Sequence, residues 1–452
     1  MNSKSIFKNT QIDMIHGPIF KNILIFAIPI FISSIFQQFY NTMDTFIVGK
    51  FLGAHSLAAI GSVNSVFDLL NGFALGLGNG LAIVTARAFG SRDETLLKRS
   101  VAGSIVIGLI SSILITLLAF VGIKPLMHAI NVPSSVFNEA YSYIIWIILF
   151  LIIMFAYNLA AGLLRSIGDS IMPLVFLIFS SILNIGLDIL LITQFSMGVA
   201  GAAVATVIAQ GISVILCIIY ILKNTKILIP SRVHYKYESS LYKELLGQGY
   251  AMAMQMTIVN SGSVILQSGI NGLGNDIIAG HTAARKLFMF VNMPFSSMSQ
   301  SIATFISQNT GASQQKRIRR SMRDAYLFDV VCAAILSLLL FLFAPAMVSF
   351  IASSHNPTIV NNGALYLKIV GPNLAVLGVL IETRSALQGI GQKILPLISS
   401  IIEFFGKILF VIAFIPRFKY MAVIFCEPTI WIVMTLYLVF AFWRTEFIRS
   451  AK

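Results

Sequence analysis

The chain has 452 residues, of which 57% are hydrophobic and only 11% are charged, and its mean hydropathy is +0.88. A soluble globular domain carries about 25% charged residues, so this composition excludes one and predicts an integral membrane protein. The net charge of +14 could indicate nucleic acid. The basic residues follow membrane topology instead, so we expect no nucleic-acid partner.

Twelve hydrophobic stretches are long enough to cross a bilayer as helices, which takes about 20 residues each. Two of them, 57–86 and 277–308, are polar enough for a hydropathy scan alone to miss. We therefore predict an all-α protein with twelve transmembrane helices. In chain order they are 22–48, 57–86, 97–121, 137–164, 170–193, 198–222, 242–270, 277–308, 324–350, 359–387, 394–416 and 420–443.

The two halves of the sequence repeat each other. Residues 52–100 align with 273–321 at a constant offset of 221, with nine identities in 49 positions. A denser match follows at an offset of 223, where 164–174 recurs as 387–397. Two matches at nearly the same offset argue against chance.

Each repeat holds six spans, so both halves enter the membrane in the same orientation. They should form two six-helix lobes related by a pseudo-two-fold axis along the membrane normal. The predicted parts are an N-terminal lobe at 1–222, a cytoplasmic linker at 223–243, a C-terminal lobe at 244–443 and a cytoplasmic tail at 444–452.

Lysine and arginine are distributed unevenly between the two sides of the predicted membrane. With a cytoplasmic N-terminus, the inside segments hold 23 of the 31, including Lys4, Lys8 and Lys452. By the positive-inside rule, both termini are expected to be cytoplasmic. No segment is long enough for a soluble catalytic domain, and no GxxxxGK[ST] phosphate loop is present. We therefore expect a gradient-driven transporter and not an enzyme.

The first span carries polar residues where lipid would be expected. Gln37, Asn41 and Asp44 are spaced i, i+4 and i+7, which places them on one stripe of the helix. A charged group in the hydrocarbon region costs several kcal/mol unless it faces a cavity or a partner. We interpret Asp44 as a carboxylate for binding or coupling. Pro29, earlier in the same span, is expected to bend the helix.

The fifth span presents a second carboxylate, because Asn184 and Asp188 are spaced i and i+4 and share a helix face. An amide oxygen and a carboxylate are hard ligands that suit Na⁺, and the same carboxylate could carry a proton instead. Asp44, Asn184 and Asp188 are therefore the candidate Na⁺ ligands. Thr206 and Asn158 could supply further oxygens, although ordinary helix packing explains each of them equally well.

The second repeat lacks these groups, since Asp44 aligns with Ile265 and Asp188 with Val411. It has charges of its own. Glu403 and Lys407 are spaced i and i+4 and can pair directly, whereas Glu382 could face substrate or pair with Arg384. Methionine-rich spans suit a promiscuous pocket, although such clusters also serve as core. The candidate substrate-binding residues are Gln37, Asn41, Asp44, Gln255, Met256, Met289, Met293 and Glu382.

Several of these patterns occur together in one known family. The turn Leu164-Arg165-Ser166-Ile167-Gly168-Asp169, the Gln-x-x-Asn-x-x-Asp first span, the Asn184/Asp188 pair and the run Gly201-Ala-Ala-x-Ala-Thr206 resemble the multidrug and toxic compound extrusion (MATE) family, bacterial branch.

The resemblance implies a monomeric exporter in the bacterial inner membrane. Organic cations would leave through a cavity between two lobes while Na⁺ or H⁺ enters, with no other cofactor. It carries over Asp44, Asn184 and Asp188, and less firmly Thr206 and Asn158. Ala161 departs from the pattern, because some members have a second amide there. The alternative is a lipid-linked saccharide flippase of the same superfamily, whose cavity would need arginines for phosphates; Arg285 and Lys286 are the main candidates here.

Overall fold

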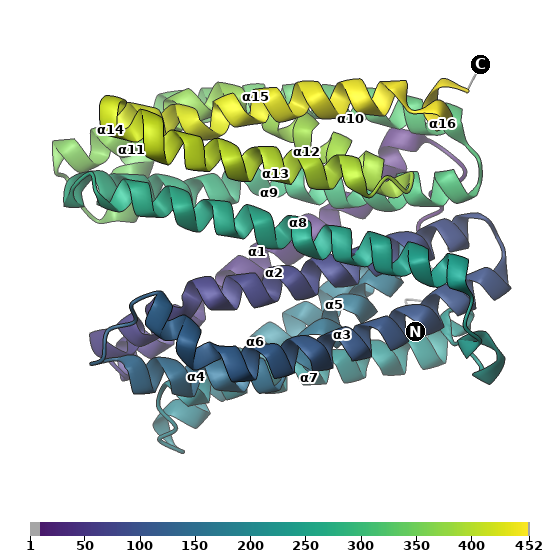
Figure 1. Cartoon of the computed structure of the whole chain (residues 1–452), viewed down its shortest axis with the longest axis horizontal. Helices are drawn as coiled ribbons and strands as arrows, with labels where there is room; N and C mark the ends of the chain where they lie inside the picture. Colours follow the sequence, from purple (N-terminus) through teal and green to yellow (C-terminus); the bar gives the residue numbers. More distant parts are fainter. Residues whose placement is uncertain (1–9, 451–452) are drawn as a thin grey trace, which may run out of the picture. The chain divides into compact units, whose positions relative to one another are not determined.

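A computed structural model of the chain describes residues 10–450, which contain helices and turns but no strand (Figure 1). Lys4, Lys8 and Lys452 lie outside the described residues. The helices are α1 (Ile19–Phe51), α2 (Ala54–Gly90), α3 (Glu94–Ala129), α4 (Phe137–Leu149), α5 (Leu151–Ser166), α6 (Ile171–Thr193), α7 (Val199–Asn224), η1 (Lys226–Leu228), η2 (Arg232–Tyr235), α8 (Ser239–Asn271), α9 (Asn275–Gly311), α10 (Gln315–Ala352), α11 (Pro357–Val370), η3 (Gly371–Asn373), α12 (Leu374–Gly389), α13 (Ile394–Leu409), η4 (Phe410–Phe414), α14 (Ile415–Phe418), α15 (Tyr420–Arg444) and α16 (Glu446–Arg449).

Each of the twelve predicted spans is occupied by helix. The fourth span is the bent pair α4 and α5, which meet at 49°. Within the described residues, nine helices are long and apolar enough to cross a membrane, or ten when the bent pair counts as one span. The stretch 57–86 lies in α2, which qualifies with a mean hydropathy of 1.5. The stretch 277–308 lies in the more polar α9, which does not qualify, and neither does α8.

The chain forms two compact units. Unit 1 consists of Ile32–Met256 together with the described part of Met1–Asp13, and unit 2 consists of Met14–Phe31 together with the described part of Thr257–Lys452. Both α1 and α8 are therefore divided between the units, and their crossing points lie 225 residues apart. This spacing is close to the repeat offset. The first helix of each repeat is therefore divided between the two units at an equivalent position. The segment between α7 and α8 is 225–238, which is shorter than the predicted linker.

The backbone confirms the internal repeat. Residues with positive φ recur in both halves at separations of 221 to 223 residues, and each marks a turn between helices. Packing within each unit agrees with this, because α2 packs against α5 and its repeat counterpart α9 packs against α12. The matched positions are Gly53 and Gly274, Arg92 and Ser313, Asn131 and Ser353, Gly168 and Gly391, and Gly198 and Lys419.

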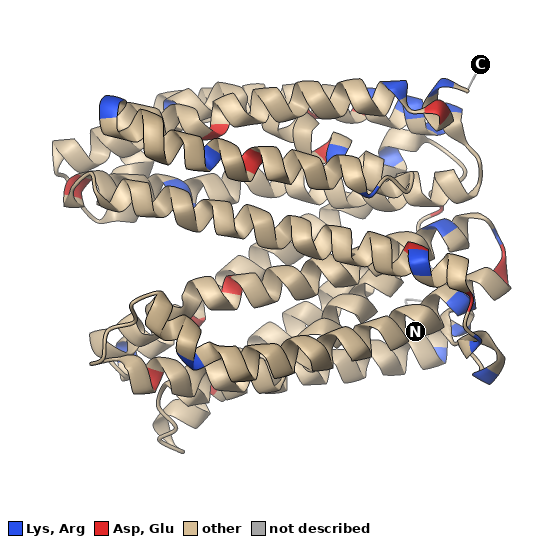
Figure 2. Cartoon of the chain, in the orientation of Figure 1, with Lys and Arg blue, Asp and Glu red and all other residues tan. Residues whose placement is uncertain are grey.

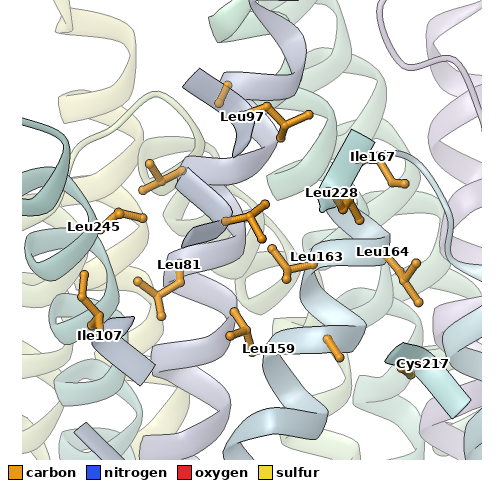
Figure 3. Close-up of a cluster of buried hydrophobic side chains, with 14 of the residues drawn as sticks. Leu81, Leu97, Ile107, Leu159, Leu163, Leu164, Ile167, Cys217, Leu228 and Leu245 are labelled. Carbon is orange, nitrogen blue, oxygen red and sulfur yellow. The ribbon is translucent and has the colours of Figure 1, made fainter. Parts of the chain in front are cut away.

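Charges lie mainly toward the helix ends (Figure 2), whereas the interior of unit 1 is filled by aliphatic side chains. Figure 3 shows part of this cluster, with Leu81 of α2, Leu163 of α5 and Leu245 of α8 buried together. Lipid tails are as apolar as leucine, so close packing rather than water exclusion holds such helices together. The cluster fixes α2, α3, α5 and α7 around one another and gives the candidate site a rigid support.

Glycines let α2 approach α8 closely within unit 1. A Cβ atom on Gly76 would lie 2.5 Å from the carbonyl oxygen of Met252, and one on Gly80 would lie 2.6 Å from that of Gln248. Such distances are too short for nonbonded atoms, so these positions require glycine. The stripe therefore serves helix packing, as small residues do in membrane helices.

We expect Gly80→Ala to destabilise the protein by about 1–3 kcal/mol, because the added methyl group would collide with the α8 backbone. Gly61→Ala is the matched control, since a Cβ at Gly61 of the same helix meets nothing within 4 Å. Removing a helical glycine there should be neutral or stabilising by up to about 1 kcal/mol. Thermal unfolding in detergent measures both. Equal melting temperatures for the two variants would contradict the close approach.

Candidate ion-binding site

Three helices of unit 1 bring four of the predicted residues together. Asp44 comes from α1, Asn184 and Asp188 from α6, and Thr206 from α7. With its amide nitrogen facing α1, Asn184 donates to Oδ1 of Asp44 at 3.0 Å, and its oxygen accepts from the backbone N–H of Thr206 at 3.3 Å. This amide orientation is assigned from the hydrogen-bond network. The predicted sharing of a helix face by Asn184 and Asp188 thus agrees with the geometry.

The Asp44 and Asp188 carboxyl groups lie close together, because Asn184, one turn before Asp188 on α6, bonds to Asp44, and the two acids interact electrostatically. Asp188 is fully buried, and its Oδ1 has no hydrogen-bond donor. Two carboxyl groups can bond to each other only when one of them carries a proton, because an ionised carboxylate has no donor. Among the described residues, no lysine or arginine forms an ion pair with either group. The pair therefore needs a proton or a cation between its oxygens.

Hydroxyl groups complete the surroundings of the acid pair. The Thr206 side chain lies near Asp44 and near Tyr40, which lies one turn before Asp44 on α1. Tyr143 of α4 interacts electrostatically with both carboxyl groups and with Asp68 of α2. These three residues were not predicted. The i, i+4 spacing of Tyr40 and Asp44 could have indicated the first, but only the fold brings Tyr143 and Asp68 close.

A small cavity of ≈ 30 Å³ opens beside the pair, lined by Gln37 and Tyr40 of α1, Asn184 of α6 and Thr206 of α7. About 10–15 Å³ is enough for one water molecule, so the cavity has room for a water or a small ion. Ser180, Ser181 and Gln210 add polar groups to its wall, and Leu177 and Ala209 add apolar ones. The described residues contain no group of three or more His, Cys, Asp or Glu side chains that could hold a metal ion. Two carboxylates with amide and hydroxyl oxygens suit Na⁺ or a proton better than a transition metal.

Two predicted residues of unit 1 make other contacts. The Asn158 amide donates to the carbonyl oxygen of Met154 on its own helix at 2.9 Å, and its Cβ packs against Gly78 of α2. Asn41 is exposed, and its carbonyl oxygen accepts a bond from the Thr45 hydroxyl. On α1, Gln37 and Tyr40 line the small cavity, whereas Asn41 does not.

The remaining substrate candidates fall in both units. In unit 1, Gln255 is buried and Met256 is half-buried. In unit 2, Met289 is 50% exposed and Met293 is buried one turn further along α9. Glu382 is fully buried and lies close to Asp329, so the predicted alternative of an ion pair with Arg384 is wrong.

A network of ion pairs runs through unit 2. Lys407 bonds to Glu403 at 2.9 Å, as its spacing predicted, and Arg285 bonds to Glu427 at 2.7 Å. Arg384 lies 3.8 Å from the second oxygen of Glu403. Tyr366 also donates to Glu427, at 3.1 Å. The network joins α9, α12, α13 and α15 of unit 2, and removing one partner would leave a buried charge without compensation.

Solved structures share this fold. A structure described as "Crystal structure of MATE in the bent conformation" superposes with a TM-score of 0.86 at 22% identity, covering 95% of this chain and 96% of that chain. A transporter of the MOP superfamily from Pyrococcus furiosus, described as having a binding pocket of reverse polarity, also gives 0.86 at 22% identity, covering 96% and 98%. The predicted fold of twelve helices in two six-helix lobes is confirmed.

Curated relatives match along most of the chain. "Probable multidrug resistance protein YpnP" of Bacillus subtilis is 24% identical over 394 residues, or 87% of each chain. "Multidrug export protein MepA" of Staphylococcus saprophyticus is 24% identical over 378 residues, covering 83% of this chain and 82% of the relative. "Probable multidrug resistance protein NorM" of Thermotoga maritima is 23% identical over 407 residues, covering 88% and 86%.

The family model MatE matches residues 29–190 and 251–413. These two segments fall in the two sequence repeats and together span well over half of the chain. The match includes Asp44, Asn184 and Asp188 in the first segment and Glu382 in the second. This multi-pass membrane protein belongs to the MatE family, whose members are transporters and not enzymes.

Proposed function

We propose that this protein is a secondary active multidrug exporter that carries organic, mostly cationic, compounds out of the cell in exchange for Na⁺ or H⁺ by alternating access. It would act as a monomer in the cytoplasmic membrane of a bacterium, with both termini inside, without a nucleic-acid partner and without a cofactor beyond the coupling ion. The multidrug resistance and export proteins among its relatives support the substrate class.

The observation that carries the proposal is the proximity of Asp44 and Asp188 in the membrane-spanning part of unit 1. Two carboxyl groups with no basic partner are unstable there unless a proton or a cation lies with them. Binding that ion relieves the repulsion, and releasing it restores the repulsion. A site with two such states can bias a conformational equilibrium, provided that the ion binds the two conformations unequally.

The oxygen ligands are consistent with either coupling ion. For Na⁺, the candidates are the Asp44 and Asp188 carboxylates, the Thr206 hydroxyl and the Asn184 amide oxygen, which would have to turn from the backbone N–H of Thr206 toward the acids. For H⁺, the two carboxyl groups would share the proton, with Thr206 and Asn184 holding Asp44 in place. Asn158 is the weaker candidate ligand, because its amide nitrogen bonds to its own helix.

The polarity of the site supports cationic substrates rather than lipid-linked saccharides. The acids of unit 1 can attract a cation when the coupling ion has left, and Gln37 on the cavity wall adds a polar contact. A flippase would need free guanidinium groups for phosphates. Arg285, the main candidate, is already bonded to Glu427 and to Tyr366. Met256, Met289 and Met293 remain candidates for the apolar part of a drug pocket.

Neutralising either carboxylate should abolish coupled export. Asp44→Asn and Asp188→Asn keep size and hydrogen bonding but remove the charge that the ion neutralises. We expect ion-driven efflux of a fluorescent cation from proteoliposomes to fall by about tenfold or more, within the range of a 1–3 kcal/mol coupling free energy. Glu94→Gln, which alters an acid paired with Lys98 at the start of α3, is the matched control and should transport normally. Wild-type efflux by a well-folded Asp188→Asn variant would rule out this site.

The coupling ion should stabilise the folded protein through the same residues. A ligand present at about 100 times its Kd adds about 2.7 kcal/mol to the free energy of unfolding. We expect melting temperature to rise with Na⁺ replacing K⁺ at constant ionic strength, or with acidification if the ion is H⁺. The rise should vanish in Asp188→Asn and shrink in Asn184→Ala and Thr206→Val. An undiminished rise in Asp188→Asn would place the ion elsewhere.

Ion and drug should oppose each other. If the ion neutralises the acid pair and lets α1, α6 and α7 pack more closely, it removes the charge that attracts a cationic drug. By linkage the effect is reciprocal, so saturating drug must weaken ion binding by the same factor, about 5- to 150-fold for a typical coupling. Measuring drug affinity at several fixed ion concentrations tests this. A drug affinity that does not change with the ion would contradict the exchange mechanism.

A further inference from the structure

A second pair of buried acids lies in unit 2, away from the residues used above. Asp329 of α10 and Glu382 of α12 are both fully buried. They lie close together, because a Cβ on Gly378, one turn before Glu382 on α12, would lie 2.6 Å from the Asp329 carboxyl carbon, and the two acids interact electrostatically. The basic residues of the nearby network are engaged by other acids, since Arg384 pairs with Glu403 and Lys407 with Glu403 and Glu427. The Asp329–Glu382 pair therefore lies outside the ion-pair network of unit 2.

None of the four carboxyl oxygens of Asp329 and Glu382 has another hydrogen-bond donor among the described residues. The groups packed around the pair are neutral. Tyr326 of α10 bonds to Thr383 of α12 at 2.7 Å, so these hydroxyls satisfy each other. Cys332 on α10 lies near Asp329, and Phe295 on α9 lies with Asp329 against Gly378. Trp443 on α15 lies near Tyr326.

Two ionised carboxylates cannot be kept together in such a place. An isolated charge in a medium of low dielectric constant costs tens of kcal/mol in the Born limit, and contact between like charges adds repulsion. Protonation of one acid removes one of the two charges and gives the pair a hydrogen-bond donor, because neutral carboxylic acid is the form of aspartate or glutamate that has one. Two neighbouring acids without another donor are an arrangement in which one proton is held by the pair.

The repeat shows that the fold does not require acids here. At the offsets of 221 and 223, Asp329 corresponds to Gly108 of α3 and Gly378 to Phe155 of α5. In unit 1 the Phe155 ring fills the space over Gly108, whereas in unit 2 a Cβ on Gly378 would lie 2.6 Å from the Asp329 carboxyl carbon. In unit 1 the glycine is on α3 and the larger residue is on α5. In unit 2 the glycine is on α12, the counterpart of α5, and the larger residue on α10 is an acid.

The residues around Asp329 also replace apolar residues of unit 1 with polar ones. At the same offsets, Tyr326 corresponds to Ile105, Glu382 to Leu159 and Thr383 to Ala160. Those three residues of unit 1 line an apolar cavity together with Phe155. An all-apolar solution to this helix crossing therefore exists in the same chain, so packing alone gives no reason for the acids of unit 2.

We propose that Asp329 and Glu382 form a proton-binding site in unit 2, separate from the Asp44–Asp188 pair. The ligand is a single proton held between the two carboxyl groups. Na⁺ fits less well, because it prefers a shell of several oxygens and the Tyr326 and Thr383 hydroxyls are already bonded to each other. The site adds a second ionic equilibrium to the protein, and its existence does not depend on the function proposed for unit 1.

Infrared spectroscopy of the purified protein tests this directly, because a protonated carboxylic acid has a carbonyl band distinct from that of a carboxylate. At neutral pH we expect Asp329→Asn and Glu382→Gln each to remove the band of about one protonated carboxyl group per molecule. Asp44→Asn should leave this component in place. Glu94→Gln, which alters an exposed acid paired with Lys98, is the control and should leave the whole band unchanged.

A repeat-swap variant separates proton binding from folding. Asp329→Gly, Gly378→Phe and Glu382→Leu together would install in unit 2 the apolar packing of unit 1. We expect this variant to fold and to lack the band. An unchanged band in folded Asp329→Asn and Glu382→Gln would overturn the proposal, as would a wild-type band that disappears when Na⁺ replaces K⁺. Loss of the band from Asp329→Asn with normal drug export would support the site and show that it is independent of export.

Discussion

The structure depends on one constraint: a carboxylate inside a membrane protein must have a partner. Some acids here meet it with a base, as Glu403 does with Lys407 and Glu427 with Arg285. Asp44 with Asp188, and Asp329 with Glu382, meet it with another acid. In an acid–base pair the two charges neutralise each other without a ligand. In an acid–acid pair the charge is neutralised only while a proton or a cation is bound. The first kind of pair stabilises a fold, and the second makes its stability depend on the ion.

The two repeats share a backbone but not their charges. Positive-φ turns recur at nearly constant separation, including Gly198 and Lys419, where the second repeat keeps the conformation with a less suitable residue. Where α3 crosses α5 the repeat is apolar, and where α10 crosses α12 it is acidic. Conversely, Asp44 and Asp188 have no acidic counterparts in the second repeat. Duplication thus supplied one scaffold, and each copy acquired an acid pair at a different helix crossing.

The sequence predicted what lies on one helix and missed what tertiary packing brings together. Helical spacing put Asn184 and Asp188 on one face, and the cost of a charge in lipid singled out Asp44. The same reasoning favoured Gln37 and Asn41, which are both exposed; Gln37 lines the small cavity, and a substrate role for Asn41 stays a prediction. Tyr143 gave no such signal, whereas Asp329 lies inside the predicted span 324–350 and was overlooked, and the partners of both lie on other helices. Glu382 was recognised as unusual, but its two predicted alternatives, contact with substrate and an ion pair with Arg384, did not include the neighbouring acid Asp329, because helical spacing does not show which residues of another helix lie close.

Helix α1 connects the two acid pairs. Its first half belongs to unit 2, where its Ile23 carbonyl accepts a bond from Ser301 of α9 at 2.8 Å and its Phe20 ring lies 6.3 Å from that of Phe328, the residue before Asp329. Its second half belongs to unit 1 and carries Asp44. Pro29 stands between the two halves and removes one helical hydrogen bond, which makes this the place where α1 bends most easily. The first half of α1 thus lies beside the Asp329 region of unit 2 and its second half carries Asp44 of unit 1, so a bend near Pro29 would change the packing of this helix next to both acids.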